Sequence, residues 1–501
     1  MTSQYVHKST DEGASWTQIS PDLTVHDPAT LGRSGGPIHG DMTGTEWYAT
    51  IYAFAESPLT KGVLWAGSDD GMVHVSRDGG AHWTNVTPKG FGKFTRTAVI
   101  EAGHFDAGTA YLATNRYQQD DFKPYLWRTT DYGQTWTAIN TGIPTGAYSR
   151  SIREDRVRRG LLFAGTETGV FVSFDDGARW EPLQLNLPRA SVRDLAIHDN
   201  DLIAATHGRA FWVIDDISVL RQIADSVMSK GMFVFQPAPA VRWVSGGGAS
   251  LTAGQNPRGG ATIDYWFKST PPAKVSLEFR DGTGKVIRTY TTDSTPNDTL
   301  KTAADSIARR AREGMRDSLV YEPADSIVSA RAGTNRFVWN LRYPGIKQLK
   351  NTVIDEGPTD GPVAPPGNYS VRLIAGRDTL VRQFTVVSDP RVKTPPTELV
   401  RQFNLALNVR DRINDVADGA TRIEDLQSQL DQRVSQSKAG TSGSRVSDAV
   451  KPLREKLEAI RAELYEVGCH ADQCTLDQPV KLYNILITIN GQVQTGDYGP
   501  T

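Results

Sequence analysis

Short runs of apolar residues, broken by Gly, Pro and Asp, dominate the chain as far as Pro390. Runs such as VLWAGSDDGMVHVS and LLFAGTETGVFVS have the length and composition of β-strands joined by tight turns. After Pro395-Pro396 the apolar spacing becomes three and four, which predicts an amphipathic helix over 397–434. A Gly/Ser stretch at 439–444 precedes a second predicted helix over 445–467 and a third candidate over 477–494.

One motif, Ser/Thr-x-Asp-x-Gly-x-x-Trp, recurs four times in the first part of the chain. Asp and Gly favour a tight turn, and the Trp ring can fold over the hairpin and fill the space between sheets, so each copy predicts a stapled β-hairpin. The Asp residues are separated by 67, 53 and 44 residues, and the shortest interval suits one four-stranded propeller blade. The motif residues are Ser9, Asp11, Gly13, Trp16; Ser76, Asp78, Gly80, Trp83; Thr129, Asp131, Gly133, Trp136; and Ser173, Asp175, Gly177, Trp180.

The longer intervals predict loop insertions at about 20–60 and 115–125. A further strand pair, at 202–206 and 211–214, lacks the motif and is interpreted as a closing blade.

These motifs resemble the Asp-boxes of BNR-repeat proteins, and the phrase ESPLTKGVLWAGSDDGMVHVSRDGGAHW resembles bacterial sortilin-like BNR proteins, often labelled glycosyl hydrolases. The resemblance implies a β-propeller over 1–220, a structural role for the motif residues, and a secreted, periplasmic or cell-surface location. Propellers of the sortilin type have more blades than the motif marks here, so we expect an incomplete propeller whose remaining blades lie upstream. The N-terminus shows no signal peptide.

Residues 231–390 alternate as half-buried strands do, with a hairpin turn at Asp281-Gly-Thr-Gly and a charged, helix-prone insertion near 300–330. The phrases FVWNLRYPG and GPVAPPGNYSVRL resemble the immunoglobulin-like domain of flagellar hook-capping proteins. The predicted fold is therefore mainly β: a partial propeller, an immunoglobulin-like β-sandwich over 231–390, and an α-helical hairpin or bundle over 395–501. A partner-binding coiled coil is the alternative for the helices.

Composition removes several classes of function. The 501 residues carry a net charge of −2, without the basic footprint of a nucleic-acid-binding protein, and no apolar run is long enough to span a membrane. The two cysteines, Cys469 and Cys474, could close a small disulfide loop in an oxidising compartment. They could also suggest zinc, but no second ligand pair stands at metal spacing, so we predict no metal and no cofactor.

The two loop insertions hold the candidate site residues, because propellers place function on loops at one end of the channel. In the first insertion Asp41 and Glu46 could form the acid and base of a glycosidase, with His39 and Trp47 contacting ligand. In the second, the side chains that could bind a cation, a sugar or a peptide are Asp120, Asp121 and Tyr125.

A sialidase would need three arginines around a substrate carboxylate. The candidates have no spacing that marks such a triad; they are Arg33, Arg96, Arg150 and Arg153.

Two functions from different classes remain open. The favoured one is a secreted or surface propeller that binds a protein, peptide or glycan ligand through its loops. The alternative is a BNR-type glycoside hydrolase that uses loop carboxylates, and a structural role in a cell-surface assembly is the third possibility.

Overall fold

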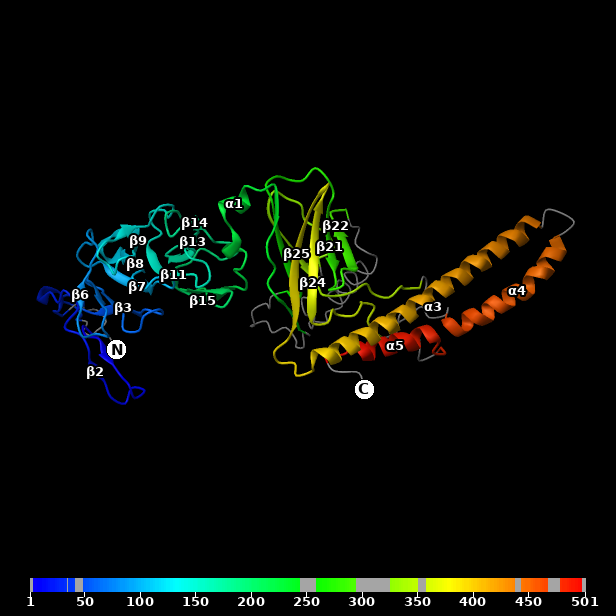
Figure 1. The fold of residues 1–501 in the computed structure, drawn as a ribbon, viewed down its shortest axis with the longest axis horizontal. Coiled ribbons are helices and arrows are strands. Elements are labelled where there is room, and N and C mark those ends of the chain that lie inside the picture. Colours follow the sequence, from blue (N-terminus) through cyan, green and yellow to red (C-terminus); the bar gives the residue numbers. More distant parts are fainter. Residues whose placement is uncertain are drawn as a thin grey trace. The chain divides into compact units, whose positions relative to one another are not determined.

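The structure is a computed structural model that describes residues 3–33, 35–40, 48–243, 258–293, 325–349, 357–437, 443–466 and 478–497. Contacts divide the chain into two compact units, Met1–Ala224 and Asp225–Thr501 (Figure 1). The sandwich and the helices therefore share one unit, and the domain boundaries drawn from the sequence at 220, 231, 390 and 395 stay predictions.

The first unit is a succession of antiparallel sheets whose strands follow chain order. Its strands are β1 (His7–Lys8), β2 (Thr17–Gln18), β3 (Ile51–Glu56), β4 (Leu64–Ser68), β5 (Val73–Ser76), β6 (Thr84–Asn85), β7 (Arg96–Ala102), β8 (Ala110–Arg116), β9 (Asp121–Thr129), β10 (Thr137–Ala138), β11 (Ser149–Glu154), β12 (Leu162–Thr166), β13 (Val170–Ser173), β14 (Glu181–Pro182), β15 (Val192–His198), β16 (Asp201–Thr206) and β17 (Phe211–Ile214). The hairpin β1–β2 precedes three four-stranded sheets, β3–β6, β7–β10 and β11–β14, and a three-stranded sheet, β15–β17.

The first strands of these sheets, β3, β7, β11 and β15, contact one another in succession. Sheets that meet in series through their first strands are the blades of a propeller. The predicted fold class, mainly β with a partial propeller, is confirmed.

The four motif segments, here called the repeat turns (9–16, 76–83, 129–136 and 173–180), share one hydrogen-bond pattern. In the third, Thr129 Oγ1 donates to Asp131 Oδ1 at 2.8 Å and accepts the Gly133 N–H at 2.9 Å. Asp131 Oδ1 also accepts the Thr135 N–H at 2.9 Å. These bonds fix the turn locally, which explains why Ser or Thr, Asp and Gly recur at fixed spacing.

The Trp of each repeat turn links its sheet to the sheet before it. The Trp83, Trp136 and Trp180 indole N–H groups donate to the carbonyls of Ile19, Val86 and Ile139, at 2.9, 2.7 and 2.6 Å. Each acceptor lies three residues after the preceding motif Trp.

The motif glycine allows this close packing. Gly133 has φ +82°, and a Cβ there would lie 2.7 Å from Val86 Cβ. A larger residue at this position would therefore both strain the backbone and push the two sheets apart.

The second unit contains a β-sandwich. Its strands are β18 (Met232–Val234), β19 (Ala240–Arg242), β20 (Ala261–Phe267), β21 (Val275–Arg280), β22 (Val286–Thr291), β23 (Gly333–Trp339), β24 (Gly367–Ala375) and β25 (Asp378–Ser388). A three-stranded sheet, β18–β20–β23, faces a five-stranded one, β19–β25–β24–β21–β22, across a core in which the Phe279 ring stacks on Trp339 at 4.9 Å. The named strands of this sandwich pair antiparallel with one exception: β19 pairs parallel with β25, because the chain crosses between the sheets after β18.

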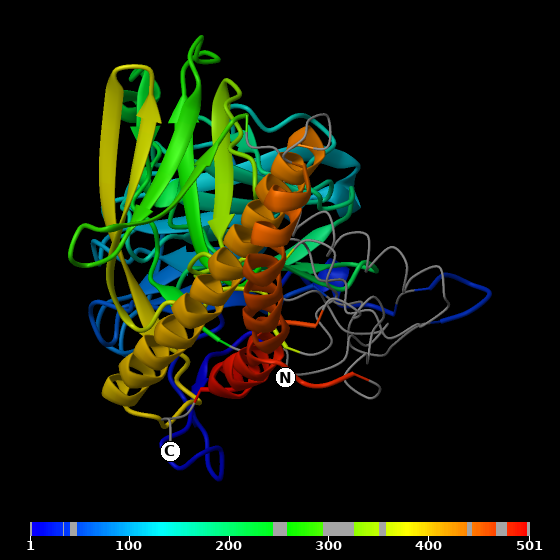
Figure 2. The same cartoon turned by 90° about the vertical axis from the view of Figure 1, so that its right-hand side faces the viewer.

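The rest of the second unit is helical, as predicted. After the short α1 (Asp225–Met228), the helices are α3 (Pro396–Ser437), α4 (Gly443–Leu464) and α5 (Leu482–Gln494). Helices α3 and α4 lie side by side (Figures 1 and 2), and α5 packs on α3 through Ile413, Tyr483 and Ile487. Among the described residues no helix is both long and apolar enough to cross a bilayer. Most of the insertion predicted near 300–330, and both cysteines, lie outside the described residues.

Candidate functional site at the end opposite the repeat turns

The propeller unit has two distinct ends. In each four-stranded sheet, the connection between the first two strands shares an end with the repeat turn, because successive antiparallel connections alternate ends. Backbone hydrogen bonds join the two loops: Gly79 N–H to Gly62 O, Tyr132 N–H to Gly108 O and Asp176 N–H to Gly160 O. The connections between second and third strands, and those from one sheet to the next, lie at the opposite end, and both predicted insertions belong there.

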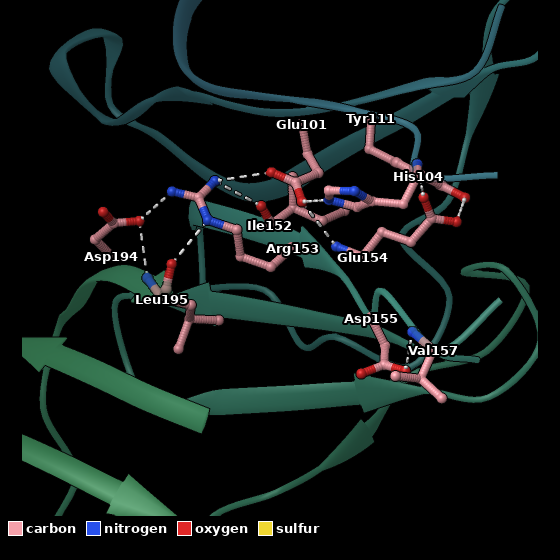
Figure 3. Close-up of polar contacts among 10 residues, drawn as sticks. All are labelled: Glu101, His104, Tyr111, Ile152, Arg153, Glu154, Asp155, Val157, Asp194 and Leu195. Carbon is pink, nitrogen blue, oxygen red and sulfur yellow. Dashed lines mark hydrogen bonds and ion pairs between the residues drawn. The ribbon is translucent and has the colours of Figure 1, made fainter. Parts of the chain in front are cut away.

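At the repeat-turn end, Arg153 of β11 ties three sheets together (Figure 3). Its guanidinium donates to Asp194 Oδ1 and to the Leu195 carbonyl of β15, both at 2.7 Å, and contacts Glu101 Oε2 of β7 at 3.4 Å. His104 Nε2 lies 3.1 Å from the other oxygen of Glu101, and the backbone N–H of His104 donates to Glu154 Oε2 at 2.7 Å. Every charged group in this cluster therefore has a partner within the protein.

Next to this cluster, the buried Tyr111 hydroxyl lies between two carboxylates. It is 2.8 Å from Asp176 Oδ1 and 3.2 Å from Glu154 Oε1. Burial raises the pKa of Glu154, and burial followed by the neighbouring Glu154 and Asp176 raises the pKa of Tyr111. The cavity beside them has a volume of about 10 Å³, room for about one water molecule, so this end supports a structural role.

At the opposite end lie five residues that we call the arginine–tyrosine cluster: Tyr52, Arg96, Tyr117, Tyr148 and Arg150. The Tyr117 ring lies between two cations, with the guanidinium carbons of Arg150 and Arg96 at 4.7 and 6.0 Å from its centroid. Arg96 also covers Tyr52 at 4.7 Å, and Arg150 covers Tyr148 at 4.6 Å. Cation–π contacts of this kind stabilise and orient guanidinium groups beside aromatic faces.

The cluster is assembled from connections of three sheets. Tyr52 stands at a register shift in β3, Arg96 begins β7, and Tyr117 begins the 3-10 turn between β8 and β9. Tyr148 immediately precedes β11, and Arg150 stands at a register shift within that strand. Connections and register shifts of this kind often carry binding residues.

The two arginines differ in how their charge is met. Arg150 is 7% exposed, and its Nε and Nη2 donate to Glu167 Oε2 at 2.9 and 2.8 Å, while Nη2 also donates to the Tyr148 hydroxyl. Arg96 is half-buried and forms no ion pair with any described carboxylate. Its Nη1 donates to the Tyr117 hydroxyl at 3.5 Å, and its buried Nε has no partner among the described residues.

Asp69 is the carboxyl group whose charge acts on Arg96, although the two form no ion pair. Asp69 is 5% exposed, and its Oδ1 accepts the Thr50 N–H at 2.9 Å. Burial, helped by the adjacent Asp70, raises the pKa of Asp69 to about 6. Asp70 is engaged elsewhere, because its oxygens accept the Ser68 hydroxyl and the Val25 and His26 N–H groups.

The predicted site residues are only partly placed. Asp121 is the first residue of β9, and its Oδ2 accepts the Tyr125 hydroxyl at 2.7 Å and contacts Arg116 at 3.5 Å. Burial, followed by the hydrogen bond to Asp121, raises the pKa of Tyr125 to about 12. Asp120 and His39 are exposed.

Three of the first insertion's candidates, Asp41, Glu46 and Trp47, lie outside the described residues. The four arginines considered for a sialidase do not converge as a set. Arg96 and Arg150 share one end, Arg153 belongs to the other, and Arg33 lies in the exposed connection before β3.

The sequence interpretation did not select Tyr52, Asp69, Tyr117 or Tyr148. These residues could have been selected by their positions in or next to connections opposite the repeat turns. Those positions can be assigned only once the strand order is known. Within the described ranges, no three His, Cys, Asp or Glu side chains gather as they would around a metal ion.

Comparisons with known proteins add little to this geometry. No family model matches the sequence, and no curated protein does. Similar solved structures include YCF48 bound to D1 peptide, which is 19% identical with a TM-score of 0.27 over 33% of this chain and 51% of that chain. A GH74 xyloglucanase from Xanthomonas campestris is 19% identical with a TM-score of 0.33 over 43% and 34% of the two chains, and an ancestral GH74 enzyme is 14% identical with a TM-score of 0.31 over 57% and 35%.

This chain thus spans about half of that YCF48 chain and about a third of each GH74 chain. Because these similarities are low, the propeller assignment rests on sheet order and on the contacts between sheets.

Proposed function

We propose that this chain is an Asp-box propeller protein of a secreted or surface setting that binds a protein, peptide or glycan ligand at the end opposite the repeat turns. In this proposal the motif residues are scaffold, and the sandwich and helices are appended modules. The observation that carries it is the arginine–tyrosine cluster, in which the Arg96 guanidinium has no ion pair with a described carboxylate and lies beside the half-exposed Tyr52 ring. Aromatic faces and an unpaired arginine are typical of binding surfaces.

The test is a binding screen with the whole chain. Fluorescent octapeptides with capped ends, and neutral and acidic oligosaccharides, are titrated while anisotropy is measured. We expect binding that Tyr52→Ala and Tyr117→Ala each weaken at least tenfold, while Arg159→Gln, at the repeat-turn end, leaves it unchanged. Binding that survives both tyrosine variants would contradict the location of the site.

One observation favours the alternative, a glycoside hydrolase. A general acid needs a carboxyl group protonated near the operating pH, and burial gives Asp69 a pKa of about 6. The same oligosaccharides are therefore assayed for release of reducing ends, with Asp69→Asn, Asp41→Asn and Glu46→Gln as variants. Turnover that one of these variants abolishes would establish the enzyme, and binding without turnover would establish the binding protein.

A further inference from the structure

We propose that Arg96 binds a carboxylate group of an acidic peptide ligand at the arginine–tyrosine cluster, which deepens the proposed function and rests on it. One position recurs in two sheets of the propeller unit, β3–β6 and β11–β14. Asp69 and Glu167 each follow the last residue of a second strand, and each donates its N–H across the sheet, to the carbonyls of Thr50 and Tyr148. The two carboxyl groups therefore occupy equivalent places at the same end.

At Glu167 a carboxylate binds an arginine of this end directly. Its Oε2 accepts two bonds from Arg150 and one from Ser191 at 2.7 Å, so cation and carboxylate satisfy one another. Asp69 makes no such bond to Arg96, because its Oδ1 is directed to the Thr50 N–H. Among the described residues, Arg96 therefore donates only one long bond, to the Tyr117 hydroxyl, and its other Nη N–H groups can meet another acceptor. A carboxylate matches the planar guanidinium best.

The surroundings favour a peptide over a glycan. Sugar hydroxyls need several carboxylate or amide partners. Four of the described carboxylates at this end already accept bonds within the protein: Asp69 from Thr50, Asp70 from Ser68, Asp121 from Tyr125, and Glu167 from Arg150. The exposed side chains beside Arg96 are aromatic. The Tyr52 and Phe54 side chains are 52% and 48% exposed and lie two residues apart on β3, the spacing of alternate side chains in an extended peptide.

The rim around the cluster is also aromatic. Tyr48 packs on Phe94 at 4.7 Å between ring centroids, and its hydroxyl accepts a bond from Gln119. Phe122 is 45% exposed and lies 6.0 Å from Tyr148. One cation within an aromatic rim fits a peptide that presents an acidic side chain or a terminal carboxylate among apolar residues.

The test uses matched capped peptides in which a central Glu is replaced by Gln, and a second pair that ends in a free carboxylate or an amide. Wild-type chain should bind a carboxylate peptide at least tenfold more tightly than its neutral partner, and the pair that discriminates identifies the source of the carboxylate. Arg96→Gln should abolish the preference while the neutral peptides bind as before, and Arg96→Lys should retain part of it. Arg153→Gln, at the other end, is the matched control and should leave the preference intact.

Each failure has its own signature. If peptides bind but wild type shows no preference, or Arg96→Gln keeps the preference, the carboxylate assignment is wrong while the binding function stands. If no peptide or oligosaccharide binds, the proposed function itself fails. Arg96-dependent binding of an oligoglucuronate without any peptide binding would overturn the peptide class. Near-ultraviolet circular dichroism establishes that each variant is folded.

Discussion

Two arginine side chains at one end of the propeller unit differ in whether a carboxylate binds them directly. The Glu167 carboxylate neutralises Arg150 by accepting hydrogen bonds from its guanidinium. The equivalent carboxyl group near Arg96, that of Asp69, instead accepts the backbone N–H of Thr50. Burial is the largest influence on Glu167, yet the bonds from Ser191 and Arg150 outweigh it and hold the pKa of Glu167 below its ordinary value. Burial instead raises the pKa of Asp69 to about 6.

The carboxyl groups of Asp69 and Glu167, which occupy equivalent places in two sheets, therefore have different roles. The Arg150–Glu167 ion pair contributes to stability. The Arg96 guanidinium, which Asp69 does not bind, is left for a ligand at some cost to stability.

The largest expected effect is on the free energy of unfolding, and it comes from removing the Arg150–Glu167 ion pair. Glu167→Gln leaves the buried Arg150 without its counter-charge, and we expect it to lower the free energy of unfolding by about 3 kcal/mol at pH 7. Because the pKa of Glu167 is lowered by folding, this loss should fade as pH falls through that pKa. Urea unfolding measures it, and a loss no larger than that of an exposed substitution would show that the pair is unimportant.

The next effect concerns the contribution of Asp69 to stability. The pKa of Asp69 is raised by folding, so its contribution to stability is present below pH 4 and is lost as pH rises through about 6. Asp69→Asn keeps an acceptor for the Thr50 N–H and should stabilise the chain by about 2 kcal/mol at pH 8 and by almost nothing at pH 4. Melting temperatures across this pH range measure it, and a pH-independent difference would contradict the raised pKa.

A smaller effect concerns ligand binding. As pH falls from 7.5 to 5.5, Asp69 becomes neutral and no longer offsets Arg96, so affinity for a carboxylate peptide should rise about threefold, or ~0.7 kcal/mol. Asp70 and Arg96 are the charged groups that act on Asp69, and His26 and His74 lie near Asp70. Anisotropy titrations with Asp69→Asn test this cause, because a pH dependence that persists in the variant would come from a group other than Asp69.

The smallest effect completes the comparison. Arg96→Gln should change the free energy of unfolding by about 0.5 kcal/mol or less, because the side chain is half-buried and has a single weak hydrogen bond among the described residues. A loss as large as that of Glu167→Gln would mean that Arg96 is structural.

The sequence predicted the scaffold better than the site. Ser or Thr, Asp and Gly act through bonds within the motif itself, and the Trp follows them at a fixed spacing, so turn chemistry and spacing were enough to locate four hairpins. Apolar period was enough for α3 and α4. The parallel pairing of β19 depends on a crossing between sheets that no local pattern encodes.

The site depends on longer-range geometry. Tyr52, Arg96 and Tyr117 are far apart in the chain, and they meet because three sheets place their connections at one end. Nothing in the local sequence distinguishes Arg96 from Arg150; the difference lies in where Asp69 and Glu167 direct their oxygens.

The bond from each motif indole to the preceding sheet also has a consequence for unfolding. Because Trp83, Trp136 and Trp180 each bridge a single junction, every blade is coupled to its nearest neighbour through a reporter that is naturally fluorescent. Loss of structure should then travel from blade to blade in discrete stages, as in solenoid proteins, and each stage should change the emission of the bridging tryptophan and of any other tryptophan in that blade.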